Sequence, residues 1–177
     1  DYSLFSLRKL ISIVTQEPIL FNNTIASNIA LGMDNAQLDE IMEAAKIANA
    51  HQFIENLPEK YQTNIGDDGN KLSGGQKQRI SIARALIKDP DILIFDDCLS
   101  AVDAKTENQI INNLYNLLGN KTAILITHRI FTVLKFDQVI IIEDGRIIEQ
   151  GTHEELLALN GYYAELYQVQ TSQETAA

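Results

Sequence analysis

Residues 72–76, with the sequence Leu-Ser-Gly-Gly-Gln, have the composition of an anion site at the start of a helix. Glycine lets backbone N–H groups approach an anion closely, and the first turn of a helix carries free N–H donors and a partial positive charge. The hydroxyl of Ser73 adds a donor. The segment therefore predicts a phosphate-binding helix start that uses no lysine, and a glycine-rich helix cap without a ligand is the alternative.

Two acidic residues, Asp96 and Asp97, directly follow the apolar run 92–95. A buried strand that delivers an aspartate at its carboxyl end is the Walker B arrangement, which holds Mg²⁺ directly or through water. A strand followed by a turn-forming aspartate pair is the alternative. His128 and Gln16 also follow expected strands, although each of them alone carries little information.

The elements that must position these residues divide the chain into a mostly helical half, 1–90, and an α/β half, 91–177. Apolar periodicity and turn residues define the boundaries. In the first half we expect a strand over 10–14 and helices over 24–31, 38–57 and 73–87. In the second half we expect strands over 92–95 and 122–127 with a helix between them, a hairpin over 139–149, a last helix opened by a capping box at Thr152, and a frayed tail from Thr171.

The run 92–95 is continuously apolar, as in a parallel strand that is covered on both faces. Strand, helix and strand then form a right-handed βαβ unit. Ligands of open parallel sheets bind beyond the carboxyl ends of the strands. This rule directs attention to Asp96, Asp97 and His128.

Composition narrows the class of protein. The chain has 177 residues, with 14 Lys plus Arg against 24 Asp plus Glu, giving a net charge of −10. An acidic chain is poorly suited to nucleic-acid backbone, so no nucleic-acid partner is expected. No run approaches the ~20 apolar residues that span a bilayer. The single cysteine, Cys98, cannot form an internal disulfide and is interpreted as a small core residue.

As an ordered set, these motifs resemble the nucleotide-binding domain of ABC transporters of the multidrug or exporter type. The set contains Gln16, residues 72–76, Asp96, residues 100–103 and His128, and residues 78–86 and 144–156 also match. The resemblance extends from Leu7 to about Tyr167. It implies an α/β fold with a P-loop NTPase-like parallel sheet core and an inserted helical subdomain. The implied parts are 1–16 (end of the N-terminal core and Q-loop), 17–88 (helical subdomain with signature), and 89–177 (RecA-like core with Walker B, D-loop and H-loop).

The resemblance also implies a role for each motif residue. Gln16 would be the Q-loop glutamine that reaches the metal and the attacking water, and Asp96 the Walker B metal ligand. The signature residues would contact the γ-phosphate of ATP held by the opposite subunit, and Asp103 would be the D-loop aspartate at the dimer interface. His128 would be the switch histidine, with a catalytic role beside Gln16 and Asp97. The signature residues are Ser73, Gly74, Gly75 and Gln76.

The implied cofactors are ATP and Mg²⁺. The implied partners are a second nucleotide-binding domain and transmembrane domains, which dock through coupling helices on the loop 66–69 with Asp67 and Asp68. The implied location is the cytoplasmic face of the cell membrane, with this segment itself soluble. A soluble ABC ATPase without a membrane domain is the alternative, and a non-catalytic dimerisation module is a second alternative for the fragment.

Two departures from the family pattern matter. The phosphate loop G-x-x-x-x-G-K-[ST] (Walker A) does not occur in the chain and is expected to precede Asp1. We therefore expect the fragment alone to be inactive and to expose an unpaired sheet edge with apolar area. Secondly, Asp97 stands where the family usually has a catalytic Glu, which resembles the degenerate half of a heterodimeric exporter. Slow catalysis by Asp97 itself is the alternative.

Overall fold

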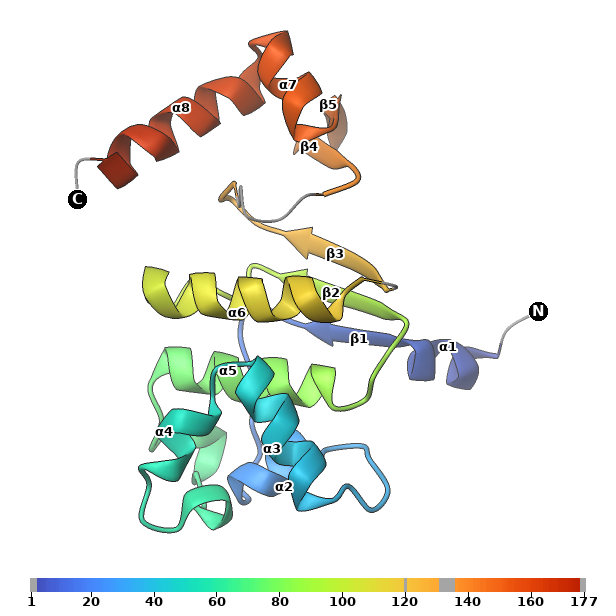
Figure 1. The fold of residues 1–177 in the computed structure, drawn as a ribbon. Helices are drawn as coiled ribbons and strands as arrows, with labels where there is room; N and C mark the ends of the chain where they lie inside the picture. The colour runs from blue at the N-terminus through green and yellow to red at the C-terminus, as the bar shows by residue number, and fades with distance from the viewer. Residues whose placement is uncertain (1–2, 120, 131–135, 176–177) are drawn as a thin grey trace. The chain divides into compact units, whose positions relative to one another are not determined.

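The computed structural model describes residues 3–119, 121–130 and 136–175 (Figure 1). Contacts divide the chain into two compact units, Asp1–Ile126 and Thr127–Ala177. In the first unit the elements are α1 (Leu4–Leu10), β1 (Ile11–Val14), α2 (Ile25–Ile29), α3 (Leu38–Ile47), α4 (His51–Glu55), the 3-10 turns η1 (Lys60–Gln62) and η2 (Asp67–Gly69), α5 (Gly74–Leu86), β2 (Ile92–Asp96), α6 (Ala104–Leu117) and β3 (Thr122–Ile126). In the second they are β4 (Val139–Glu143), β5 (Arg146–Gly151), α7 (His153–Leu159) and α8 (Tyr162–Thr175).

The centre of the first unit is a three-stranded sheet in the order β1-β2-β3. Both pairings are parallel, as expected, and α6 connects β2 to β3. In register, Val14 lies beside Phe95, and both side chains are buried, like that of Leu93. This confirms the α/β fold class, with a parallel core next to a helical subdomain.

The opposite face of the same sheet carries an apolar row that is largely uncovered by the described residues. Ile13, Ile94 and Ile124 lie side by side in register. Ile13 is 56% exposed and Ile124 is 47% exposed. Ile94 of β2 itself is half-buried on this face, so the described residues cover β2 there only in part, whereas the expected exposed apolar area is present on β1 and β3.

The helical subdomain groups α2, α3 and α4 around α5, which also packs against β1 (Figure 1). Its core consists of aliphatic side chains that are fully or almost fully buried. They include Ile25, Ile29, Ile41, Ile54, Ile80 and Ile82. Because Ile80 and Ile82 are both fully buried, α5 is enclosed on more than one side.

The expectation of a single helix over 38–57 is wrong, because the structure has two helices there, α3 and α4, with a helix break between them. Asn49 adopts the left-handed conformation (φ 52°), which asparagine tolerates better than most residues. Nη1 of Arg79 on α5 donates to the carbonyl oxygen of Asn49 (2.9 Å), and the amide of Ala50 bonds the carbonyl of Ala45. The break is therefore held by a side chain thirty positions away, which local periodicity does not reveal.

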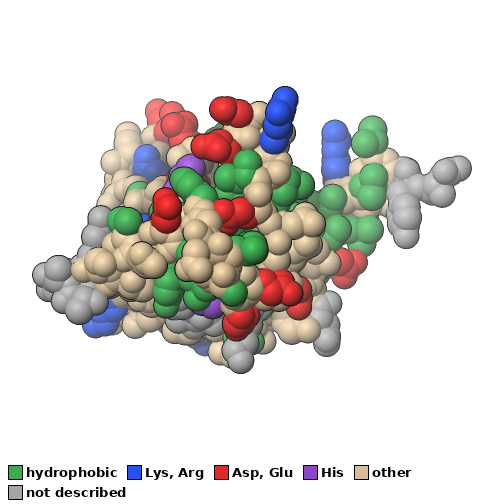
Figure 2. Space-filling view, turned by 90° about the horizontal axis from the view of Figure 1, so that it is seen from above, with side chains coloured by type: hydrophobic (Ala, Val, Ile, Leu, Met, Phe, Trp, Pro, Cys, Tyr) green, Lys and Arg blue, Asp and Glu red, His purple; other side chains and the backbone are tan. Residues whose placement is uncertain are grey.

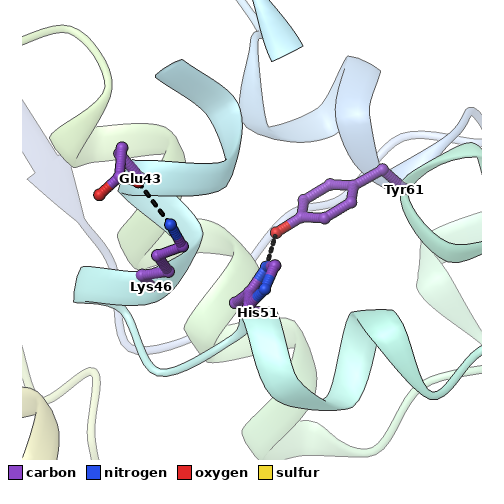
Figure 3. Close-up of polar contacts among 4 residues, drawn as sticks. All are labelled: Glu43, Lys46, His51 and Tyr61. Atoms are coloured by element: carbon purple, nitrogen blue, oxygen red, sulfur yellow. Dashed lines mark hydrogen bonds and ion pairs between the residues drawn. The ribbon is translucent and has the colours of Figure 1, made fainter. Parts of the chain in front are cut away.

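Two polar contacts within this subdomain are shown in Figure 3, one between α4 and η1 and one within α3. His51 Nδ1 and the hydroxyl of Tyr61 lie 2.8 Å apart, which ties the start of α4 to η1. Burial raises the pKa of Tyr61 to about 12, so its hydroxyl stays protonated across the physiological range. On α3, the ammonium of Lys46 pairs with the carboxylate of Glu43.

The second unit contains the hairpin and two helices. Asp144 (φ 48°) and Gly145 (φ 73°) form the turn between β4 and β5, as two successive left-handed residues do in a type I′ hairpin. Thr152 and Glu155 form the expected capping box at the start of α7. Ile130, Leu156 and Tyr163 form the core of this unit.

Two expectations about the C-terminal region are wrong. The last helix is divided at Asn160, which is left-handed (φ 49°) and is followed by Gly161, so that α7 ends and α8 begins. The tail is also helical beyond Thr171, because α8 continues to Thr175. The hydroxyl of Thr171 bonds the carbonyl of Tyr167, within the helix itself.

Figure 2 shows carboxylates distributed over one face, with hydrophobic side chains exposed between them. Within the described residues, no helix combines the length and apolar character required to cross a bilayer.

Candidate functional site

The start of α5 is shaped by residues 73–76. The hydroxyl oxygen of Ser73 accepts from the amide of Gln76 (3.3 Å), and Oε1 of Gln76 accepts from the amide of Ser73 (3.0 Å). In this capping box, both side chains that were predicted to contact a ligand are used to cap the helix. The amides of Gly74 and Gly75 are the first-turn donors that the box does not use.

Glycine is required at position 75 by a close approach of the backbone. A Cβ atom there would lie 2.9 Å from the carbonyl oxygen of Ala101. At Gly74 the nearest atom would be the Cβ of Ala101 at 3.5 Å, an ordinary contact. The first turn of α5 therefore packs against the segment that follows β2.

Gln78 connects the helix start to the strand ends, a role that was not predicted from the sequence. Its side chain is only 3% exposed. Oε1 accepts from the amide of Ala101 (3.2 Å), and Nε2 lies 3.5 Å from the carbonyl oxygen of Gln16. The available signal in the sequence was its position four residues before Ile82, because residues four apart share a helix face and a polar group on an apolar face needs partners.

At the carboxyl edge of the sheet, Gln16 and Asp97 meet. Because β1 and β2 run parallel, the residues that follow them emerge at the same edge. Nε2 of Gln16 donates to Oδ2 of Asp97 (3.0 Å). Asp97 is left-handed (φ 42°), and its amide donates to the carbonyl of Ile126 (2.9 Å). The structure therefore brings these two predicted site residues together, although a hydrogen bond between them was not predicted.

Asp96 ends β2, and its half-buried carboxylate makes no hydrogen bond or ion pair to any residue that the structure describes. No group of three or more His, Cys, Asp or Glu side chains that could hold a metal occurs among the described residues. Mg²⁺ is usually held by one or two carboxylates, with substrate phosphates and water completing the shell. The carboxylate of Asp96 fits that donor set.

Asp103 is the N-cap of α6. Its carboxylate accepts from the amide of Thr106 (3.0 Å), and this hydrogen bond lowers the pKa of Asp103. Asp103 is exposed. Cys98 is buried and the pKa of its thiol is raised to about 12 by burial, which confirms the interpretation as a core residue.

The remaining predicted residues are His128 in the second unit and the acidic pair of the loop 66–69. His128 is exposed and belongs to the second unit. Asp67, in the loop 66–69, accepts from Nδ2 of Asn22 (2.6 Å), which fixes the loop to the segment before α2. Asp68 is left-handed (φ 50°) and exposed.

A parallel sheet with an acidic pair beyond its carboxyl edge and a glycine-rich helix start packed beside it has the P-loop NTPase-like architecture. Residues 2–100 match the sequence family described as ABC transporter. This chain therefore belongs to the ABC transporter family.

Individual relatives agree with the family. The chain is 49% identical over 166 residues to "ABC transporter B family member 2" of Dictyostelium discoideum, covering 94% of this chain and 12% of that protein. It is 49% identical over 170 residues to "ATP-dependent lipid A-core flippase" of Syntrophus aciditrophicus, covering 96% and 28%. A solved structure described as a bacterial Atm1-family ABC exporter with ATP bound superposes with a TM-score of 0.87 at 44% identity, covering 94% of this chain and 29% of that one. The chain thus spans less than a third of each of these relatives.

Proposed function

We propose that the chain is part of the ATP-binding and hydrolysing motor domain of an ABC exporter, which energises transport by nucleotide-driven dimerisation. The observation that carries this proposal is the start of α5. Its first-turn amides stay open while Gly75 packs against Ala101. This arrangement supports an oxyanion contact made by the helix start, for a triphosphate that a second nucleotide-binding domain holds.

The strand edge supports the second part of the proposal, the ligation of Mg²⁺. When bound, the ion would neutralise charge that develops on the phosphates. Asp96 would hold it, because its carboxylate has no competing partner among the described residues. Gln16 would orient the attacking water from the end of the neighbouring strand β1, and His128 would act at the γ-phosphate. Asp103 would lie at the interface between the two domains.

Asp97 would be a weakened base. Its carboxylate is one methylene closer to the backbone than that of Glu, and it is held by Gln16 (3.0 Å). A displacement of about 1 Å can lower a rate ~10²-fold. We therefore propose a heterodimer in which this chain contributes an intact signature to the partner's competent site and a weakened Walker B edge to its own.

For the 177 residues alone we propose no hydrolysis, because they contain no G-x-x-x-x-G-K-[ST] segment to hold the β- and γ-phosphates. This absence favours a second candidate function for the isolated chain, a non-catalytic dimerisation module. Turnover of ATP by the purified chain, free of contaminants, would contradict the proposal that these residues alone do not hydrolyse ATP.

Within the complete transporter we propose that this segment lies on the cytoplasmic side of the membrane, with the loop 66–69 facing the coupling helices. We propose the parts 1–16, 17–88 and 89–177 as its subdomains.

The experiment compares Gly74→Asp with Asp97→Asn in the complete heterodimeric transporter. A carboxylate at residue 74 repels a triphosphate at the helix start, so ATPase activity should fall at least ~10²-fold, the scale of losing one oxyanion donor. Asp97→Asn should change the activity less than about threefold, because the partner's site carries most of the turnover. Equal losses in the two variants would contradict the asymmetric assignment, whereas unchanged activity in Gly74→Asp would contradict the role of the helix start.

A further inference from the structure

A polar pocket on the first unit adjoins the first turn of α5 through Arg79, and its lining includes neither the signature residues 73–76 nor the acidic pair Asp96 and Asp97. Its volume is about 280 Å³, and it lies between α4, α5 and α6. Gln52, Phe53 and Asn56 line it from the side of α4, and Lys105 and Gln109 line it from α6. None of the described residues that line it is a carboxylate, although the chain as a whole has a net charge of −10.

Arg79 on α5 is the fixed centre of this pocket. Its Nη1 donates to the carbonyl of Asn49 (2.9 Å) and its Nε donates to the carbonyl of Gly75 (3.2 Å). The guanidinium lies over the ring of Phe53, 4.7 Å from the centroid. These contacts leave Nη2 without a hydrogen bond to any described residue. The guanidinium is therefore held in one orientation with one free donor group, which reduces the entropic cost of binding a ligand.

The positive charge of the pocket is not neutralised by an ion pair. Neither Arg79 nor Lys105 forms a salt bridge within the part of the chain that the structure describes. Burial lowers the pKa of Arg79, and the nearby carboxylate of Asp103 opposes that shift. Asp103, however, is occupied as the N-cap of α6 through Thr106. A partly buried cation without a counter-ion gains from an anion that reaches it.

The size of the pocket restricts the ligand. Its volume of about 280 Å³ lies below the ~300–1,000 Å³ of pockets for drug-sized ligands. Guanidinium forks match the oxygens of a phosphate, and ammonium groups bind them as point charges. We propose that this pocket binds a small phosphate-type oxyanion, with Nη2 of Arg79 and Nζ of Lys105 as the charged donors. The side-chain amides of Gln52, Asn56 and Gln109 supply the neutral donors.

Titration of the full, isotope-labelled chain with inorganic phosphate at constant ionic strength tests this proposal. The backbone amide signals of Thr106 and Gln109 report on the pocket, and those of Gly74 and Gly75 report on the α5 start. The pocket signals should shift saturably, with a dissociation constant in the millimolar range. Lys105→Gln, at an exposed position, should keep the fold by circular dichroism and weaken the binding at least fivefold.

Two further samples give the controls. Lys46→Gln removes one positive charge on α3, outside the pocket, and should leave the dissociation constant unchanged. Gln109→Glu places a carboxylate in the pocket and should abolish the saturable shift. The proposal is overturned by linear shifts without saturation, by equal weakening in Lys46→Gln and Lys105→Gln, or by shifts confined to Gly74 and Gly75. Equal affinity for acetate would overturn the assignment to phosphate.

Discussion

The start of α5 and the carboxyl edge of the sheet are built over very different ranges of sequence. At the helix start, Ser73 and Gln76 cap each other three positions apart. At the sheet edge, Gln16 and Asp97 are 81 positions apart and meet only because β1 pairs with β2. The first site is therefore encoded by a local motif, whereas the second depends on the integrity of the whole sheet.

The two regions meet at the segment after β2 and through the side chain of Gln78. The carbonyl oxygen of Ala101 lies close to Gly75, and the amide of Ala101 donates a hydrogen bond to Oε1 of Gln78. A change at this point should affect both regions, whereas a change in the cap should affect only the helix. The following predictions use that difference, beginning with the largest expected effect.

Gly75→Ala should have the largest effect on stability, because Gly75 lies at the contact between α5 and the segment after β2. The added Cβ would lie 2.9 Å from a backbone oxygen that has no flexible end to move away. Overpacking of this kind costs about 1–3 kcal/mol, measured as the loss in free energy of unfolding in urea. Gly74→Ala is the matched control, and it should be neutral or stabilising, because its Cβ meets an ordinary contact at 3.5 Å. Equal stabilities of the two variants would show that the close approach is absent.

Gln78→Leu should cause the second largest loss of stability. The substitution removes both contacts of a buried side chain and leaves the amide of Ala101 without its partner. An unsatisfied buried group costs about 1–3 kcal/mol, again measured in urea. Gln62→Leu, at an exposed position, should change the stability by less than ~0.5 kcal/mol. If both variants unfold at the same urea concentration, Gln78 does not join the two regions.

Ser73→Ala should have a smaller, local effect. It removes the side-chain acceptor for the amide of Gln76 and should cost about 1 kcal/mol of unfolding free energy. Thr152→Ala removes the equivalent cap of α7 in the second unit. Hydrogen exchange should show faster opening of α5 alone in the first variant and of α7 alone in the second. Simultaneous opening of both helices would contradict a local cap.

Much of the start of α5 could be predicted from the sequence, because it depends on residues within three or four positions of each other. The Asp144–Gly145 turn and the capping box at Thr152 could be predicted for the same reason. The strands β2 and β3 were also predicted, because continuous apolar runs are typical of a parallel sheet.

The parts that the sequence did not reveal depend on distant partners. The break at Asn49 is held by Arg79, while the apolar periodicity continues through it. The hydrogen bond between Gln16 and Asp97 and the bridging role of Gln78 also arise only when the strands pair. The uncovered row of Ile13, Ile94 and Ile124 follows from which elements pack on the sheet, and no single segment contains that information.

The smallest effect at neutral pH concerns Cys98, beside the acidic pair. Burial raises the pKa of its thiol to about 12. The folded state therefore favours the protonated thiol, so its contribution to stability is complete below pH ~9 and is lost as the pH rises toward 12. Wild type should lose more stability than Cys98→Ala between pH 8 and pH 10.5, measured by thermal unfolding. The two tyrosines with raised pKa values are present in both proteins, so the difference isolates the thiol. Parallel pH profiles would show that the thiol is not buried.

The most direct test of the account is a structure of the complete transporter with a non-hydrolysable ATP analogue and Mg²⁺ bound at both composite sites. The account predicts that the amides of Gly74 and Gly75 lie within hydrogen-bonding distance, about 3 Å, of a γ-phosphate oxygen held by the partner domain. A fully closed dimer in which residues 73–76 remain far from every triphosphate would contradict it.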